Sequence, residues 1–228
     1  MKYILSFIVI LSNLIAQQEC DNGRYNTEIF ENVNITSGIF YGSNVNSGFL
    51  GDVIQDLYLD FYEPIDDDLE RRPLVLMLFG GSYIGGSRTS SDIVEICTRY
   101  AKMGYVAAAI DYRLTTELIF LANEATAYKA AAKGIHDLKG AIRYFRMNDV
   151  LYNDYKIDTD RIYAGGVSAG AISAVNAAYL NLDVEIPEFI QTYISENGGL
   201  EGNSGNPEYS SDFHGIINLC GAVGHTDW

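Results

Sequence analysis

Short apolar runs that alternate with segments of helical spacing constrain the fold of this chain more than any other feature of its sequence. The run Leu74–Phe79 is uninterrupted and is closed by two glycines, which is typical of a strand buried on both faces of a parallel sheet. Three later runs, Tyr105–Asp111, Arg161–Gly165 and Ile216–Ala222, predict further parallel strands. Because parallel strands need crossover connections, the alternation predicts an α/β sheet with helices on both faces.

The segments between these runs have apolar residues at helical spacing. Helices are therefore predicted over Ser90–Met103, Ala125–Met147 and Ala169–Leu180. Before them the pattern changes, and Ile35–Tyr41 and Asp56–Tyr62 predict an antiparallel pair of strands at the N-terminal side of the sheet. The period of two in the second strand places on one face Leu57, Leu59 and Phe61.

Two polar segments are predicted to lie outside the sheet. The acidic run Asp66–Asp68 follows Pro64 and predicts a solvated surface loop. Residues 181–213 are rich in Glu, Asn, Gly and Ser, and we expect this irregular insertion to form a cap or rim over a site.

Length and charge exclude some functions. A chain of 228 residues is expected to form one domain. Its 30 acidic and 15 basic residues give a net charge of −15, which repels phosphate backbones and anionic membrane surfaces. The chain is therefore not expected to bind nucleic acid.

Residues 1–16 are predicted to be a signal peptide. Met1-Lys2 gives a short positive start, Ile4–Ile15 is apolar but too short to span a bilayer, and Ala16 is a small residue at the cleavage point. Cleavage would leave residues 17–228 as a single secreted or periplasmic domain without stable membrane association. The alternatives are a buried N-terminal strand and an uncleaved anchor.

Three scattered cysteines, Cys20, Cys97 and Cys220, are too few for a metal site or a disulfide scaffold. Export would permit one disulfide, for which Cys20 and Cys97 are the favoured pair. The alternative is that Cys97 and Cys220, which lie in apolar runs, are buried thiols. The sequence contains no C-x-x-C or histidine-rich cluster that would support zinc binding.

One motif carries a strong chemical signal, the sequence Gly-Val-Ser-Ala-Gly at residues 166–170. It fits G-x-S-x-G and lies after a predicted strand and before a predicted helix, the context in which a serine is exposed on a sharp turn. Ser168 is therefore the candidate nucleophile. The backbone N–H of Ala169, at a helix N-terminus, is a candidate donor to an oxyanion. The alternative is a structural turn with an inert serine.

A glycine-rich stretch, Phe79–Tyr83, follows the first parallel strand. Acyl transfer builds negative charge on a carbonyl oxygen, and backbone N–H groups must already point to that position. We predict that Gly81 and Ser82 supply the remaining oxyanion donors. An ordinary glycine turn is the alternative, but the two motifs occur in the order and at the strand ends that acyl transfer requires.

These residues give the chain a resemblance to the α/β-hydrolase superfamily, and specifically to secreted bacterial carboxylesterase-like and lipase-like members. The resemblance covers most of the chain from about Asp56 and is carried by Leu74–Ser87, Gly104–Leu114 and Arg161–Gly170. The loop Gly199–Tyr209 is also similar to loops of exported esterases related to feruloyl esterases and polyester depolymerases. The resemblance implies an α/β-hydrolase fold, a nucleophile at Ser168 and no cofactor or metal.

The chain departs from this pattern at two places. Such enzymes commonly carry a histidine before the glycine-rich loop, where this chain has Phe79. They also place the acid and the histidine of the triad after the serine, beyond strands that follow Ile216–Ala222. Only six residues, Val223–Trp228, remain there. We therefore expect the last strands, the triad acid and the triad histidine to lie beyond Trp228, and the chain as given to be an inactive or very weak fragment.

Residues within the chain offer weak substitutes for the missing triad members. His136 lies in a predicted helix and is interpreted as a surface or packing residue, and His214 lies at the wrong end of a parallel strand. His225 and Asp227 follow the last strand at the productive edge, where a rim position is the favoured interpretation. Asp111 is predicted to organise the turn that follows it.

The sequence thus predicts a serine carboxylic-ester hydrolase that acts through an acyl-enzyme on a small-molecule or polymer-linked ester. Two alternatives stay open. One is a serine peptidase of the prolyl-oligopeptidase kind, and the other is a non-catalytic binding protein with a hydrolase fold. Acyl specificity and oligomeric state are not indicated by the sequence.

Overall fold

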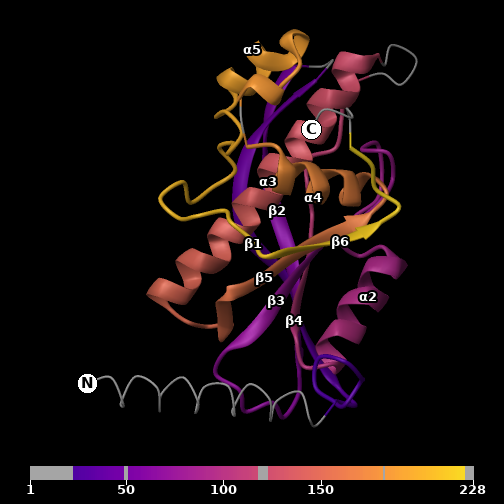
Figure 1. The fold of residues 1–228 in the computed structure, drawn as a ribbon, viewed down its shortest axis with the longest axis vertical. Coiled ribbons are helices and arrows are strands. Elements are labelled where there is room, and N and C mark those ends of the chain that lie inside the picture. Colours follow the sequence, from indigo (N-terminus) through magenta and orange to yellow (C-terminus); the bar gives the residue numbers. More distant parts are fainter. Residues whose placement is uncertain (1–22, 49–50, 118–122, 182, 224–228) are drawn as a thin grey trace, which may run out of the picture.

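The computed structural model describes residues 23–48, 51–117, 123–181 and 183–223. The predicted signal peptide, Cys20, His225 and Asp227 lie outside these ranges, so their roles stay predictions. The described residues form a six-stranded sheet in the order β1-β2-β4-β3-β5-β6 (Figure 1). The strands are β1 (Val33–Gly48), β2 (Gly51–Pro64), β3 (Arg72–Leu78), β4 (Val106–Ile110), β5 (Ile157–Val167) and β6 (Gly215–Leu219).

The pairing of the strands confirms the predicted mixed sheet. β1 pairs with β2 and β2 pairs with β4 in antiparallel fashion, whereas β4, β3, β5 and β6 are parallel. β1 and β2 are much longer than the strands predicted from the sequence, because the Gly/Asn/Ser-rich residues between them continue the ladder toward the hairpin end.

Helices cover both faces of the sheet (Figure 1). Helix α2 (Ser91–Lys102) lies on one face against β2 and β4, whereas α3 (Glu124–Leu151) and α4 (Ala169–Tyr179) lie on the other face. The segment between α4 and β6 contains a short 3-10 helix, η2 (Asp183–Glu185), and α5 (Glu188–Glu196), which packs on α3. Among the described residues, no helix has the length and apolar character needed to cross a bilayer.

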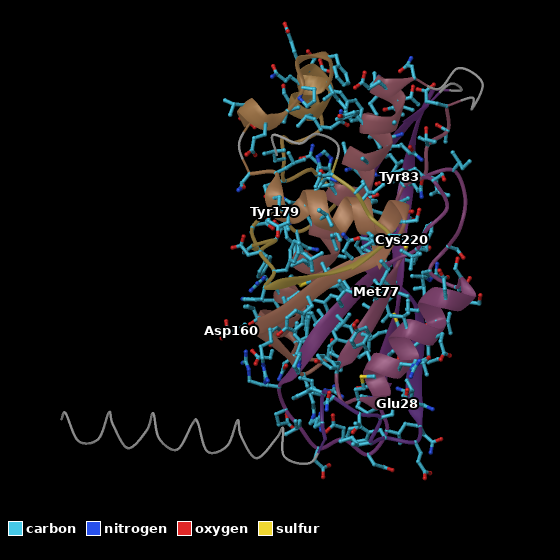
Figure 2. The ribbon with its side chains drawn as sticks, turned by 45° about the vertical axis from the view of Figure 1, so that its right-hand side comes forward. Glu28, Met77, Tyr83, Asp160, Tyr179 and Cys220 are labelled. Atoms are coloured by element: carbon cyan, nitrogen blue, oxygen red, sulfur yellow. The ribbon has the colours of Figure 1, made fainter. Side chains whose placement is uncertain are left out.

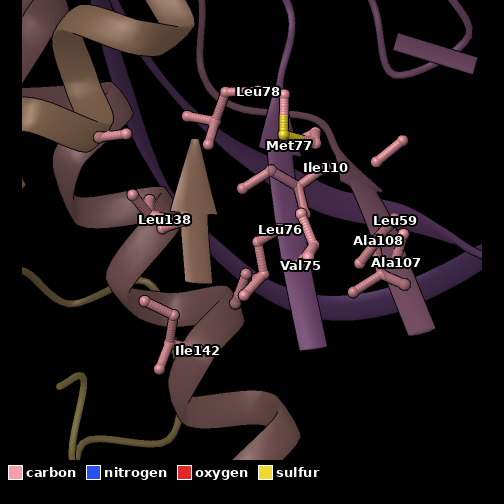
Figure 3. Close-up of a cluster of buried hydrophobic side chains, with 14 of the residues drawn as sticks. Leu59, Val75, Leu76, Met77, Leu78, Ala107, Ala108, Ile110, Leu138 and Ile142 are labelled. Carbon is pink, nitrogen blue, oxygen red and sulfur yellow. The ribbon is translucent and has the colours of Figure 1, made fainter. Parts of the chain in front are cut away.

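The core is centred on β3, whose seven residues are all buried. Alternate side chains of the strand point to opposite faces, so the uninterrupted apolar run serves both helical layers. Figure 3 shows Leu138 and Ile142 of α3 on the side of the sheet toward which Leu76 and Leu78 point. Each fully buried leucine of this kind stabilises the fold by about 1.5–3 kcal/mol.

Both faces of β2 are buried in the second half of the strand, which the sequence pattern did not predict. Leu57, Leu59 and Phe61 lie in the core as expected. Asp60 and Tyr62, on the opposite face, are only 3% and 1% exposed, because α2 packs against that face. The alternation therefore indicated the strand but underestimated its burial.

The buried-thiol interpretation of Cys97 is confirmed, whereas its predicted partner Cys20 lies outside the described residues. Cys97 is a free, fully buried thiol on the sheet-facing side of α2. Burial raises its pKa, since a thiolate would lose its hydration in the core. Cys220 is free and exposed, so for this residue the buried-thiol interpretation is wrong.

The acidic run Asp66–Asp68 is not simply a solvated loop. The side chain of Asp67 is 3% exposed and accepts two hydrogen bonds from the Arg24 guanidinium, at 3.0 and 2.5 Å. The same guanidinium donates to the carbonyl oxygen of Gly104 at 2.9 Å, so this ion pair ties the N-terminal segment to the turn after α2.

The junction between β5 and α4 is packed directly on the end of β3. A Cβ added at Gly170 would lie 2.6 Å from the carbonyl carbon of Leu78, and one at Gly166 would lie 2.6 Å from its carbonyl oxygen. Contacts this short with backbone cannot be relieved by a side-chain movement. Both glycines are therefore required by the close approach of the two chain segments.

Gly170→Ala is expected to destabilise the protein by about 3 kcal/mol, because the new methyl group overlaps backbone. Helix propensity alone predicts the opposite sign, a gain of about 0.5–1 kcal/mol. Gly85→Ala is the matched control, since nothing lies within 4 Å of its added Cβ. Urea unfolding of the two variants measures the difference, and a Gly170→Ala variant as stable as the control would contradict the close approach.

Candidate active site

Ser168 lies on a strained turn between β5 and α4. Its backbone has φ 52° and ψ −114°, a conformation that residues other than glycine rarely adopt and that typically stores about 1–3 kcal/mol. The turn is held by its own N–H, which donates to the carbonyl oxygen of Leu219 at the end of β6 at 2.8 Å. In Figure 2, Tyr179 marks the far end of α4, whereas Tyr83 and Cys220 lie near the end at which the helix begins. The Ser168 side chain is partly exposed there.

The glycine-rich loop after β3 contacts this turn. A Cβ added at Gly80 would lie 3.1 Å from the carbonyl oxygen of Val167 and 3.4 Å from the Cβ of Ser168. The next three residues, Gly81, Ser82 and Tyr83, have φ values of 128°, 55° and 61°, so the loop turns sharply away from the strand. The two motifs that the sequence singled out are therefore neighbours in space.

The three candidate donor amides have no competing acceptor in the described part of the chain. The N–H groups of Gly81 and Ser82 donate to no acceptor there, whereas the carbonyl oxygen of Gly81 accepts from Ile84 at 3.0 Å. Ala169 is the first residue of α4, and the first N–H groups of a helix have no intrahelical acceptor. These amides are thus free to bind an anion.

Aromatic residues hold the glycine-rich loop in the absence of the family's histidine. Phe79 stacks on Tyr112 with ring centroids 4.3 Å apart, and the Tyr112 hydroxyl donates to the Phe79 carbonyl oxygen at 2.8 Å. The Tyr83 hydroxyl reaches across to α4, donates to the carbonyl oxygen of Ala169 at 2.8 Å and lies 3.0 Å from Ser173 Oγ. Burial raises the pKa of Tyr83 to about 12, which keeps this hydroxyl protonated.

The segment that continues from the glycine-rich loop toward α2 is fixed by Arg88. Its Nε donates to Asp60 of β2 at 2.8 Å, its N–H donates to Asp111 at 2.9 Å, and its guanidinium also contacts Asp111. Asp111 was predicted to organise the turn after β4, and this prediction is wrong. Its side chain instead binds the loop that begins at Gly80.

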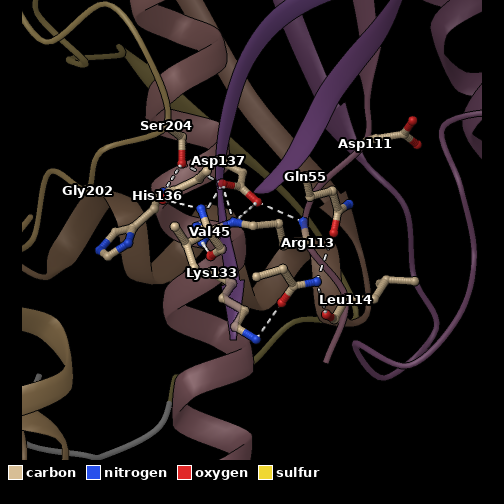
Figure 4. Close-up of polar contacts among 12 residues, drawn as sticks. Val45, Gln55, Asp111, Arg113, Leu114, Lys133, His136, Asp137, Gly202 and Ser204 are labelled. Atoms are coloured by element: carbon tan, nitrogen blue, oxygen red, sulfur yellow. Dashed lines mark hydrogen bonds and ion pairs between the residues drawn. The ribbon is translucent and has the colours of Figure 1, made fainter. Parts of the chain in front are cut away.

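A buried ion pair supports the segment that carries Tyr112 (Figure 4). Arg113, which follows β4, and Asp137, which lies on α3, are both fully buried. The Asp137 carboxylate accepts hydrogen bonds from the Arg113 backbone N–H at 2.7 Å and from its side-chain Nε at 3.0 Å. Ser204 Oγ donates to the same carboxylate at 2.6 Å, and the guanidinium donates to the carbonyl oxygen of Val45 at 2.6 Å. Removing one partner of such a pair usually destabilises a protein by about 3–5 kcal/mol.

Lys133 extends this network to the end of β1, near the turn that joins it to β2. Its Nζ donates to Asn46 Oδ1 at 2.7 Å and to the carbonyl oxygen of Ser47 at 2.8 Å. The network therefore ties α3 to β1, to the segment after β4 and to the loop at Ser204. Sequence reasoning missed it because its members are far apart in the chain and belong to no motif.

The two described histidines do not serve Ser168. His136 is 2% exposed and its Nε2 lies 2.8 Å from the carbonyl oxygen of Gly199, which confirms its interpretation as a packing residue. The ring of His214 accepts from the N–H of Ile162 at 3.2 Å, at the start of β6, so it too belongs to the sheet. The Ser168 side chain makes no capping hydrogen bond to α4. Nor do these residues include a cluster of three metal-ligating side chains.

The fold, with a strand, a serine turn and a helix beside a glycine-rich loop, is that of an α/β hydrolase. The BD-FAE family model matches residues 59–223, and the chain belongs to this α/β-hydrolase-type family. None of the curated proteins compared with the chain matches its sequence.

The chain is similar in fold to solved structures of esterase 2 from Thermogutta terrifontis. The apo form is 23% identical with a TM-score of 0.55, and the match covers 86% of this chain and 57% of that chain. The form phosphonylated by cyclosarin is 23% identical with a TM-score of 0.57 and coverages of 87% and 60%. The butyrate-bound form is 26% identical with a TM-score of 0.51 and coverages of 79% and 54%. The chain thus spans somewhat more than half the length of these esterase structures.

His136→Gln is expected to make the protein less sensitive to acid. Burial lowers the pKa of His136 from 6.5 to about 4, so only the unfolded chain takes up this proton as the pH falls below 6.5. The proton therefore favours unfolding, and this residue lowers the free energy of unfolding by about 2 kcal/mol between pH 7 and pH 5.

Urea unfolding at the two pH values checks this expectation, because the glutamine amide can still donate to Gly199 while it does not titrate. Other acidic and basic groups contribute equally to both proteins and cancel in the comparison. The same pH dependence in both proteins would show that His136 is not held neutral in the fold.

Proposed function

We propose that this chain carries the nucleophile and the oxyanion site of a serine carboxylic-ester hydrolase. Ser168 Oγ attacks the ester carbonyl carbon while a base removes its proton. The bond to the alcohol then breaks, the alcohol leaves with a proton, and the acyl group stays on Oγ. Water attacks this acyl-enzyme in the second half of the reaction, which releases the acid and restores Ser168.

The observation that carries the proposal is the contact between the Ser168 turn and the glycine-rich loop. Gly80 lies against Val167 and Ser168, and the next two residues have N–H groups without a competing acceptor among the described residues. Ala169 adds an N–H at the start of α4, where the helix dipole favours negative charge. Gly81, Ser82 and Ala169 are the donors that we assign to the oxyanion.

Preorganised N–H groups of this kind are effective because they need no rearrangement when charge develops on the carbonyl oxygen. Loss of one such donor lowers kcat by about a hundredfold to a thousandfold in enzymes where it has been measured. The hydrogen bonds of Tyr83 and Tyr112 keep the loop in place, so the aromatic pair would do the organising that a histidine commonly does.

The proposal needs a general base from outside the described residues, because His136 and His214 are both engaged elsewhere. The same observation favours a second candidate function, a non-catalytic binding protein with a hydrolase fold. The two differ in one property, namely whether Ser168 reacts as a nucleophile.

Labelling with a small ethyl fluorophosphonate separates the two functions. In the full-length gene product we expect one ethylphosphonyl group on Ser168, located by mass spectrometry, together with turnover of p-nitrophenyl acetate. The esterase 2 structures include forms phosphonylated by cyclosarin and by sarin. Ser168→Ala should abolish both signals, whereas the control Ser210→Ala, at an exposed position, should retain them.

Absence of both labelling and turnover in the folded wild-type protein would overturn the hydrolase proposal and favour the binding protein. Labelling that persists in Ser168→Ala would show that another residue is the nucleophile.

A further inference from the structure

An apolar pocket with a volume of about 200 Å³ lies between α3, α4 and α5. Its walls are formed mainly by aliphatic side chains, which include Ala131 and Ile135 of α3, Ile172 of α4, and Ile190 and Ile194 of α5. The last two residues and Ile186 pack on Ala132 in an apolar cluster of their own, separate from the main core. The segment between α4 and β6 therefore roofs a cavity that the sheet and the other helices leave open.

One wall of this pocket includes Ile172, on the helix that begins just after Ser168. Ile172 follows Ser168 by one helical turn, about 6 Å along the axis, and its N–H donates to the Ser168 carbonyl oxygen at 2.9 Å. Tyr83, which also lines the pocket, follows Ser82 directly. The walls thus include the residue one turn after the proposed nucleophile and the residue that follows a proposed oxyanion donor.

Three of the polar side chains in the walls form hydrogen bonds within the protein. His136 Nε2 pairs with the Gly199 carbonyl oxygen, Asn176 Nδ2 donates to that of Ile172 at 2.8 Å, and the Tyr83 hydroxyl donates to that of Ala169. A charge placed in the pocket would lose its hydration among mainly apolar side chains, which is unfavourable. The pocket therefore favours a purely apolar occupant.

The volume indicates the size of that occupant. A dry, apolar cavity of about 150 Å³ binds benzene, so this somewhat larger pocket would accept a group of about six carbon atoms. We propose, on the basis of the proposed function, that the pocket holds the acyl chain of the ester and selects unbranched aliphatic chains of about six carbons.

The chain-length dependence of hydrolysis tests the proposal. Burial of each methylene raises affinity by about fourfold, so the four extra methylenes of p-nitrophenyl hexanoate should raise kcat/KM over that for the acetate by about two hundredfold. Ala131→Phe fills the pocket and should reduce this ratio to below about tenfold. The matched control is Ala125→Phe, on the same helix but outside the lining, and it should leave the ratio unchanged.

A second variant keeps the test decisive if Ala131→Phe does not fold, which circular dichroism would show. Ile190→Ala removes part of the roof and should move the preferred acyl chain from hexanoyl toward octanoyl. A flat dependence on chain length in the wild type, or an equal effect of the control, would overturn the pocket assignment while leaving ester hydrolysis intact.

Binding of 1-hexanol, followed by NMR, needs no reaction and separates the pocket from the chemistry. Hexanol should bind at least tenfold more tightly than 1-propanol, and Ala131→Phe should remove the difference. If this holds while Ser168 neither labels nor turns over esters, the apolar-chain pocket is supported and the proposed function is overturned. If hexanol shows no such preference, the pocket assignment is overturned.

Discussion

The close approach of two backbone segments, the end of β3 and the turn between β5 and α4, is the constraint on which the rest of the structure depends. The Leu78 carbonyl group lies where a side chain at Gly166 or Gly170 would be. Because β3 and β5 are parallel neighbours, the residues that follow them emerge at the same edge of the sheet, and this brings Gly80 against Ser168. The glycines therefore do more than permit a turn. They set the distance between the serine and the glycine-rich loop, and any hydrolytic chemistry requires that distance to be short.

Much of this arrangement could be predicted from the sequence, because the elements that form it carry local signals. The uninterrupted run Leu74–Phe79 indicated the central strand, and the spacing in Ser90–Met103 indicated α2. The G-x-S-x-G motif was predicted to lie on a strand–turn–helix junction, and the junction occurs there. The lengths of β1 and β2 were not predictable in this way, since a polar hairpin end such as Asn44–Gly48 is ordered by its ladder partner and not by its own pattern.

The polar contacts that support the site left no such signal. Arg113 and Asp137 are 24 residues apart, and Arg24 and Asp67 are 43 apart, so neither pair has a local spacing that predicts it. At Phe79, where the resemblance led us to expect a histidine, the loop is held by stacking on Tyr112. The Phe79 side chain cannot form a hydrogen bond. Its backbone carbonyl oxygen accepts one from the Tyr112 hydroxyl instead. The apolar pocket was equally hidden, because it forms only where α5 packs on α3.

The most direct test of the central claim is a crystal structure of the protein after reaction with ethyl fluorophosphonate. The account predicts a covalent bond from phosphorus to Ser168 Oγ, with the phosphoryl oxygen about 2.7–3.1 Å from the backbone nitrogen of Ala169 and from that of Gly81 or Ser82. A phosphoryl oxygen that points to solvent, or that binds other groups, would contradict the account even if Ser168 were modified.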